Sequence, residues 1–296
     1  MDLIVQPQDG LAPVLSALDA AEKTIDITMF RLDRPAIVKA LGAAVTRGVT
    51  VRALIAHTNR KGDKALRKLE LKLLEAGVTV ARTADDLPRY HGKLLTVDRD
   101  TLYLLGFNYT KLDIEKSRSF GLVVEDDEVV REAVRLFEAD LLKQDYTPQH
   151  ASLVVSPDNA RERLSAFIKE ATRELLIYDG RLSDKAMIKV LAERAKAGVD
   201  VRVLGRCAKS ARLRSEKLPR HRLHIRAIVR DGEQAFVGSQ SLRKMELDQR
   251  REVGMIVAHR PTVKRLQATF EEDWALTGAG KEDQRTEAKA ARAEAV

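Results

Sequence analysis

The chain carries one pattern of residues twice, and this internal duplication constrains its fold more than any other feature. Residues 3–7, an apolar run that ends in proline, return 150 positions later as residues 153–157. His91 and the residues around it return 133 positions later around His224. A repeat that covers nearly the whole length predicts two copies of one folding unit.

Short β-rich runs alternate with helical patterns inside each copy. In the first copy, residues 24–30 and 49–54 have the composition of strands, whereas 37–46 and 64–76 carry apolar residues at helical spacing. This alternation predicts an α/β fold, and two copies predict two mixed, mostly parallel sheets related by a pseudo-twofold axis. The offset between the copies falls from 150 to 133 where the first copy has residues 64–76 and the second a shorter, basic run.

The repeat boundaries predict three regions. We expect the first repeat over residues 1–148, the second over 149–276, and a charged, alanine-rich tail over 277–296. The division lies in the segment 145–152, which contains Pro148. The tail has no apolar face, so we expect a frayed helix or a disordered segment.

The composition favours a soluble protein with anionic partners. The net charge is +8 and the pI is about 9.5, which favours nucleic acid, acidic lipid surfaces or phosphorylated small molecules. Cys207 is the single cysteine, which excludes an internal disulfide framework and a cysteine-based metal site. We see no signal-peptide pattern and no run of roughly 18 uncharged apolar residues. We therefore expect a cytoplasmic protein, with peripheral membrane contact left open.

The later part of each repeat carries a histidine, a cation and an aspartate in the same register. Alternation along an expected strand over residues 89–97 places His91 and Lys93 on one face, and a strand over 225–229 does the same in the second copy. An imidazole can act as nucleophile or general acid near neutral pH, and a cation neutralises charge on phosphate oxygens. The pattern therefore indicates phosphate chemistry. Its members are His91, Lys93, Asp98 and Asn108 in the first copy and His224, Arg226, Asp231 and Ser241 in the second.

This doubled pattern resembles the signature H-x-K-x4-D-x6-G-S-x-N of the phospholipase D superfamily, and the similarity spans about residues 3–275. The resemblance implies one active site at the interface of the two repeats, with both histidines facing one phosphate. One histidine would attack phosphorus to give a phosphohistidine, and the other would protonate the leaving alcohol, without a metal or other cofactor. Since both half-sites lie in one chain, a monomer would suffice. Bacterial chains of this build resemble cardiolipin synthases and related phosphodiesterases.

The match to the signature has gaps. In the first repeat Gly106 comes one place late and the Gly-Ser pair is lost, whereas the second repeat keeps Gly238 and Ser239. The second repeat has Arg226 where the signature has lysine and Ser241 where it has asparagine. Arginine keeps the positive charge but is not equivalent to lysine in geometry. These departures leave open a catalytically weak binding protein.

The family commonly pairs each histidine with a downstream carboxylate. Glu252 lies 28 residues after His224, and the equivalent position in the first repeat is Ser119. A carboxylate on the far nitrogen fixes the tautomer and raises basicity, so this reading favours His224 as the nucleophile and His91 as the proton donor. The reverse assignment stays open, as does a surface ion pair between Glu252 and Arg251.

The remaining candidates have supporting roles. We expect Asp98 and Asp231 to serve structure, with a metal site as the alternative that lacks an acidic partner at ligand spacing. The basic run over residues 206–226 holds eight lysines and arginines against one acid, Glu216. We expect three of its residues to hold anionic substrate, with a solvated loop as the alternative; they are Arg220, His221 and Arg222.

These observations favour a phosphodiesterase or phosphatidyltransferase that acts on phospholipid, with peripheral membrane contact through its basic face. A nuclease or nucleic-acid-processing enzyme is the first alternative, supported by the basic charge. The aromatic content of 4% speaks against a groove that stacks bases.

Overall fold

The computed structural model describes residues 1–58, 62–208 and 213–294, with the backbone alone over 292–294. The first half runs through β1 (Asp2–Gln6), α1 (Ala12–Ala20), β2 (Thr24–Met29), α2 (Pro35–Thr46), β3 (Thr50–Ile55), α3 (Asp63–Glu75), β4 (Thr79–Arg82), β5 (Leu94–Val97), β6 (Thr101–Leu105), α4 (Lys111–Glu115), β7 (Ser117–Val124) and α5 (Asp127–Leu142). The second half runs through β8 (Leu153–Ser156), α6 (Ala160–Lys169), β9 (Glu174–Leu182), α7 (Lys185–Lys196), β10 (Asp200–Cys207), β11 (Arg214–Glu216), β12 (Arg222–Leu223), β13 (Arg226–Arg230), β14 (Gln234–Gly238), α8 (Lys244–Asp248), β15 (Glu252–Val257), α9 (Arg260–Ala275) and α10 (Gly278–Glu294).

The two halves have the same topology. The first sheet has the order β1-β7-β6-β5-β2-β3-β4, and the second has β8-β15-β14-β13-β9-β10-β11. Each strand of one order is the repeat equivalent of the strand at the same place in the other, which confirms the α/β fold with two related sheets. α3 has no helical counterpart in the described part of the second half, where the short strand β11 follows β10.

The expectation that these sheets are mostly parallel is wrong. Only β2-β3-β4 in the first sheet and β9-β10-β11 in the second pair in parallel along these orders. The other neighbours are antiparallel, from β1 through β7, β6 and β5 to β2, with the same arrangement in the second sheet. Short turns connect β5 to β6 and β13 to β14, and such turns can join only antiparallel strands.

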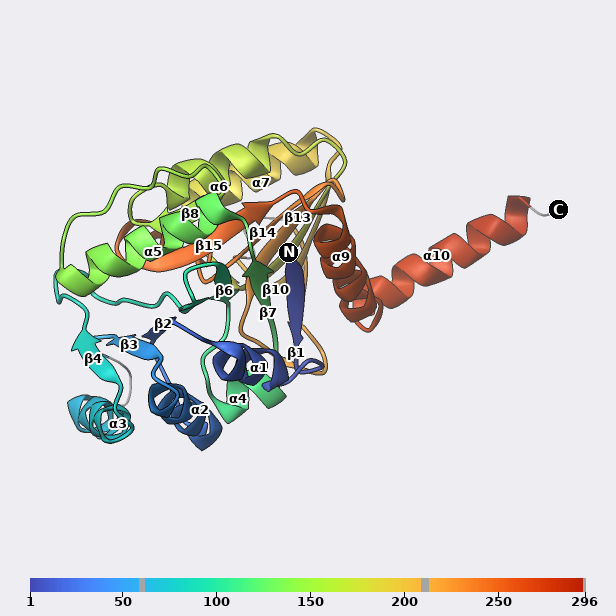
Figure 1. The fold of residues 1–296 in the computed structure, drawn as a ribbon. Helices are drawn as coiled ribbons and strands as arrows, with labels where there is room; N and C mark the ends of the chain where they lie inside the picture. The colour runs from blue at the N-terminus through green and yellow to red at the C-terminus, as the bar shows by residue number, and fades with distance from the viewer. Residues whose placement is uncertain (59–61, 209–212, 295–296) are drawn as a thin grey trace.

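A shared apolar core joins the halves. It contains buried residues from β5, β6, β7 and α5 together with residues from β9, β13, β14, β15 and α9. At its centre Phe120 and Tyr178 lie edge to face at 5.4 Å, and Tyr178 contacts Phe270 at 5.1 Å. Separate apolar clusters fix α1 and α2 to the first sheet and α6 and α7 to the second. Figure 1 shows these two helix pairs on opposite sides of the strands.

Residues 278–294 of the C-terminal segment form the helix α10, the helical one of the two expected forms, which projects from the body (Figure 1). Its alanine, lysine and glutamate content has high helix propensity. The Asp283 carboxylate accepts hydrogen bonds from Trp274 Nε1 at 3.0 Å and from Arg214 at 2.6 Å, which ties the start of α10 to the core. The division expected near residue 148 stays a prediction; α5 ends before it and β8 begins after it. None of the described helices is long and apolar enough to cross a bilayer.

Candidate active site

Both histidines lie at the boundary between the halves, immediately before a strand. The strand expected over residues 89–97 begins only at Leu94, so His91 and Lys93 precede β5. The backbone N–H of His91 donates to the carbonyl oxygen of Arg251 at 2.7 Å, and that of His224 donates to the carbonyl oxygen of Arg118 at 3.2 Å. Each histidine is thus bonded to the opposite half. These two contacts bring both sequence motifs to one interface.

The tightness of this interface explains the displaced glycine. A Cβ atom at Gly106 would lie 2.1 Å from Cδ1 of Ile225, which belongs to the other half, and 2.9 Å from the carbonyl oxygen of Phe120. Rotation of Ile225 could relieve the first contact, but the second is with backbone, so a side chain at this position would have to displace β7. Glycine at position 106 is therefore required by packing, whatever its offset from the signature.

Glu252 holds His91 rather than His224. The Nδ1 atom of His91 lies 2.7 Å from Oε2 of Glu252, whose side chain is 1% exposed. The expectation that Glu252 orients the histidine of its own repeat is wrong, because the backbone bond from His91 to Arg251 places the next residue beside the opposite histidine. No described residue hydrogen-bonds to Nε2 of His91. This arrangement fixes the tautomer of His91 and leaves Nε2 free among the described residues.

His224 has a different partner, Asp113, which sequence reasoning missed. Its Nε2 atom lies 3.4 Å from Oδ2 of Asp113, a buried residue of α4. The side chain of Asn108 donates to the same oxygen at 2.6 Å, and Arg222 donates to the other carboxylate oxygen at 2.7 Å. Asn108 therefore positions a carboxylate instead of facing the site directly. The repeat offers a signal for this acid, since Asp113 and Glu246 are 133 positions apart.

The second half-site lacks the acid that Glu252 supplies to the first. Ser119 stands at the equivalent position, fully buried in β7. Its hydroxyl and Nδ1 of His224 are both buried, and neither has a hydrogen-bond partner among the described residues. The two histidines thus share a backbone environment but differ in which nitrogen carries a carboxylate.

Burial and positive charge keep the first histidine neutral. Burial lowers the pKa of His91 well below its usual value, and the charges of Lys93, Arg226, Arg89 and Arg250 lower it further. A neutral imidazole is the form that can attack phosphorus. The same cations make this interface a favourable place for an anion.

The pKa values of His224 and Lys93 are also shifted. Burial lowers the pKa of His224 well below its usual value, while the negative charge of Asp113 opposes this shift. Burial lowers the pKa of Lys93 to about 7, against the opposing charge of Glu252. Lys93 Nζ donates to the carbonyl oxygen of His91 at 2.6 Å, so the lysine is held next to the histidine. A bound anion would raise the pKa of each of these groups.

Arg226 takes the place of Lys93 in the second half. Its guanidinium donates to the carbonyl oxygen of His224 at 3.0 Å, which matches the bond made by Lys93. Its charge opposes the rise that burial causes in the pKa of Asp179. The hydroxyl of Ser241 donates to Asp179, as Asn108 does to its own carboxylate. The second half thus has arginine in place of lysine and serine in place of asparagine. These two changes come with a carboxylate, Asp179, that the first half lacks.

Each motif aspartate ties two segments of its own sheet together. The Asp98 carboxylate accepts from the backbone N–H groups of residues 22–24, and Asp231 accepts from those of residues 172–174. Both aspartates have left-handed backbone angles, with φ of 53° and 56°. Burial raises the pKa of each, but these backbone hydrogen bonds outweigh it and lower the pKa. Among the described residues, no three metal-binding side chains gather in one place.

The Gly-Ser turn of the second half supports Glu252. Gly238 pairs with Gly254 across β14 and β15, and a Cβ at Gly238 would lie 2.6 Å from the Cα of Gly254. The Ser239 hydroxyl accepts from the backbone N–H of Val253 at 3.1 Å. Burial raises the pKa of Glu252, and the nearby Lys93 charge opposes this shift.

The three residues of the basic run that we expected to hold substrate differ in how they contact the histidine site. Arg222 reaches it through its bond to Asp113, and His221 joins Arg222 in lining a cavity of about 300 Å³ with Arg206 and Lys217. No carboxylate is among the described residues that line this cavity. Arg220 is exposed and is not among its lining residues. Residues 209–212 of the basic run lie outside the described part of the chain.

Comparison with known proteins agrees with this geometry. Residues 14–141 and 164–274 match the family described as "Cardiolipin synthase, PLD-like domain". The human protein named mitochondrial cardiolipin hydrolase is 32% identical over 133 residues, which are 44% of this chain and 50% of that protein. The alignment thus spans about half the length of this curated relative.

Two solved structures share the fold at low sequence identity. Phosphatidylserine synthase from Haemophilus influenzae has a TM-score of 0.71 at 12% identity, over 92% of this chain and 84% of the other. Polyphosphate kinase from Porphyromonas gingivalis has a TM-score of 0.75 at 19% identity, over 91% of this chain and 49% of the other. These likenesses concern the fold alone. The two matched stretches cover most of the sequence, and the chain belongs to the phospholipase D superfamily.

Proposed function

We propose that this chain is a phosphodiesterase that cleaves a phospholipid in two steps, with His91 as the nucleophile and His224 as the proton donor. The contact of Glu252 with Nδ1 of His91 at 2.7 Å is the observation that carries the assignment. It supports the reverse of the roles that the sequence favoured. The cation pair Lys93 and Arg226 would hold the non-bridging oxygens of the phosphate.

In the first step, Nε2 of His91 attacks phosphorus, the P–N bond forms and the bond from phosphorus to the leaving oxygen breaks. His224 gives its proton to that oxygen, so the alcohol leaves neutral. The anionic phosphodiester raises the pKa of His224 on binding, and the neighbouring Asp113 adds to this effect. In the second step, water or an alcohol gives a proton to His224 and attacks phosphorus, and the P–N bond breaks.

Two of the comparisons support a lipid substrate. The family description names cardiolipin synthase and the human relative is named a cardiolipin hydrolase. Cleavage by water would make the chain a hydrolase, and cleavage by an alcohol would make it a phosphatidyltransferase. A nucleic-acid phosphodiesterase is the second candidate, favoured by the cavity lined by Arg206, Lys217 and Arg222 without a carboxylate. Since both histidines lie in one chain, we propose that a monomer suffices, in the cytoplasm with peripheral membrane contact.

The test compares substrate classes directly. The full chain is incubated with phosphatidylglycerol or phosphatidylcholine vesicles, or with single- or double-stranded DNA, in the presence of EDTA. We expect release of phosphatidic acid or transfer of the phosphatidyl group, and none of it with His91→Ala. DNA cleavage without lipid turnover would replace the lipid proposal by the nuclease. Folded protein that turns over none of these and forms no phosphohistidine would instead be a binding protein.

A further inference from the structure

The helix α3 presents an unusual exposed surface. Leu66 and Leu73 are buried against the body, as expected for an amphipathic helix. Two further leucines of the same helix face solvent instead, since Leu71 is 51% exposed and Leu74 is 50% exposed. α3 lies at the periphery of the first half (Figure 1). Nothing in the described part of the chain covers these two side chains.

The charges of α3 are mostly positive and unpaired. Two of its acids, Asp63 and Glu70, are bound to Arg82 at 2.8 Å each, which leaves Glu75 as its one acid without a described partner. The cations of the helix form no ion pair with any described residue; they are Lys64, Arg67, Lys68 and Lys72. The exposed surface of α3 therefore combines net positive charge with two apolar side chains.

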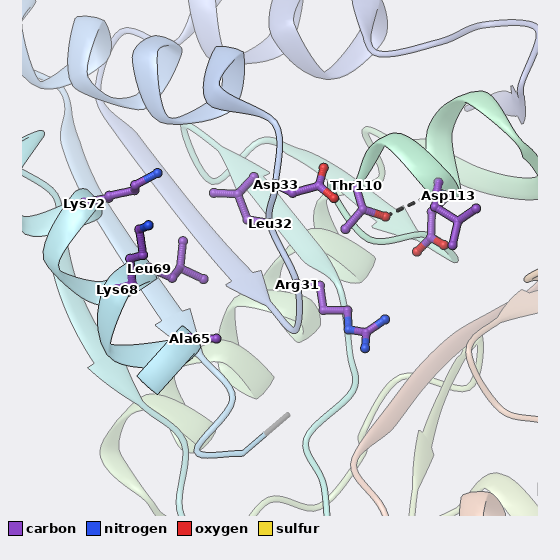
Figure 2. A pocket seen from close by; sticks show the side chains of 10 residues that line it. Arg31, Leu32, Asp33, Ala65, Lys68, Leu69, Lys72, Thr110 and Asp113 are labelled. Carbon is purple, nitrogen blue, oxygen red and sulfur yellow. Dashed lines mark hydrogen bonds between the residues drawn. The ribbon is translucent and has the colours of Figure 1, made fainter. Parts of the chain in front are cut away.

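A cavity lies between this helix and Asp113, the residue that contacts His224. It has a volume of about 500 Å³ and lies between α3 and the segment around α4. Figure 2 shows Lys68, Leu69 and Lys72 on one side and Asp113 on the other. Asp113 is also the partner of His224, so the cavity reaches a direct neighbour of that histidine. The described residues that line it include no aromatic side chain; they are Arg31, Leu32, Asp33, Ala65, Lys68, Leu69, Lys72, Thr110, Leu112 and Asp113.

The cavity and the exposed surface are adjacent around the helix. At about 100° per residue, Lys72 and Lys68 fall between Ala65, which lines the cavity, and Leu71, which faces solvent. Leu112, on the opposite wall, is itself 48% exposed. A ligand that contacts the exposed surface of α3 is thus next to the entrance of the cavity.

We propose that α3 is the surface by which this chain contacts an anionic lipid bilayer, and that the adjacent cavity leads a lipid phosphodiester toward His224. Leu71 and Leu74 would enter the lipid interface, while Lys64, Arg67 and the neighbouring lysines contact lipid phosphates. The part that concerns the cavity rests on the proposed lipid substrate. Exposed leucines and the absence of stacking rings in the cavity favour lipid over a nucleic-acid strand.

Vesicle binding of the full chain tests this surface without requiring turnover. Binding is measured by cosedimentation with vesicles of phosphatidylglycerol and phosphatidylcholine, and with phosphatidylcholine alone. We expect stronger binding to the anionic vesicles. The double variant Lys68→Gln/Lys72→Gln should weaken it by about 10- to 30-fold, since each charge near an anionic surface contributes roughly fivefold. Lys185→Gln/Lys189→Gln, at the same spacing on exposed positions of α7, is the matched control and should bind like the wild type.

The leucines have a control of their own. Leu71→Ser/Leu74→Ser should weaken binding, whereas Leu142→Ser, a change at a residue that is 60% exposed on α5, should not. Hydrolysis of bis(p-nitrophenyl) phosphate reports whether each variant keeps a folded site. Equal vesicle binding by the α3 variants and their controls would overturn the proposal. It would also be overturned if the α3 variants lost binding to DNA but kept binding to vesicles. A wild type that binds vesicles through α3 yet cleaves no lipid would contradict the proposed function alone.

Discussion

The two half-sites share one backbone frame and differ in the side chains set into it. In both halves the histidine N–H bonds to the opposite half and the motif cation bonds to the histidine carbonyl. The first histidine has a carboxylate on Nδ1, whereas the second has one near Nε2 and an unpaired Nδ1. A duplicated frame with divergent partners can give two identical residue types different tasks.

Buried ion pairs hold this frame in matching places. Arg118 bonds to Asp273 at 2.7 Å and Arg251 bonds to Asp140 at 3.1 Å, and the two pairs occupy equivalent repeat positions. The carbonyl oxygens of the same arginines accept from the histidine backbones. Removal of one member of such a pair commonly costs about 3–5 kcal/mol, so we expect this part of the frame to tolerate little change.

The largest expected effect separates the histidines by their tasks. We expect His91→Ala to lower kcat by about 10⁴- to 10⁶-fold on every phosphodiester, because it removes the attacking atom. His224→Ala should lower kcat by about 10²- to 10⁴-fold on an alkyl ester. On a p-nitrophenyl ester, whose leaving group needs no proton, it should slow the first release of p-nitrophenol by less than about tenfold, although the second step, which uses His224 as the base, is slowed. Pre-steady-state rates of leaving-group release from the two esters check this contrast, and the opposite pattern would exchange the roles.

The next effect concerns the carboxylate that only the first histidine has on Nδ1. Glu252→Gln should lower kcat by about 10²- to 10⁴-fold with little change in KM, because the amide no longer fixes the tautomer. Glu252→Asp should recover part of the activity. Rates on the p-nitrophenyl ester isolate the attack from protonation of the leaving group. A Glu252→Gln enzyme impaired only on alkyl esters would show that Glu252 serves the proton donor.

These contrasts separate the features that could be predicted from the sequence from those that could not. The repeat offsets predict the duplicated α/β fold and bring His91 and His224 together, because the same local patterns build the same units. They do not show that Glu252 crosses to the other half, since that contact depends on how the two sheets pack. Asp113 is equally hidden, because the short helix α4 reaches His224 only after the halves associate. The predicted strand direction failed because short turns, from β5 to β6 and from β13 to β14, set an antiparallel order in each sheet.

A smaller effect follows from the buried Lys93. On a p-nitrophenyl ester the active free enzyme has neutral His91 and charged Lys93. The kcat/KM should therefore rise with pH through the lowered pKa of His91 and fall again near pH 7, as Lys93 loses its proton. Lys93→Arg, which copies Arg226 of the second half, should remove the fall because arginine stays charged. An unchanged alkaline limb in this variant would assign it to another group.

The smallest expected effect comes from adding the carboxylate that the second half-site lacks. Ser119→Asp would place a carboxylate near the unpaired Nδ1 of His224 and raise the pKa of that imidazole. We expect turnover of alkyl esters to rise by about three- to tenfold, as His224 is more often protonated, with the p-nitrophenyl ester unchanged. Thermal unfolding of Ser119→Asp and of Ser119→Asn shows whether the buried position accepts the charge. A gain on both esters would instead indicate an effect on the attack by His91.

The histidine that carries the phosphorus after the first step decides between the two assignments of roles. The chain with His224→Ala is mixed rapidly with a p-nitrophenyl phosphodiester, quenched in base and digested, and the modified peptide is identified by mass spectrometry. Attack by His91, held at Nδ1 by Glu252, predicts a phosphoryl adduct on the peptide that contains residue 91. The wild type with the same ester should give that adduct too, at lower occupancy. An adduct of the wild type on His224, with none on His91, would contradict the central claim.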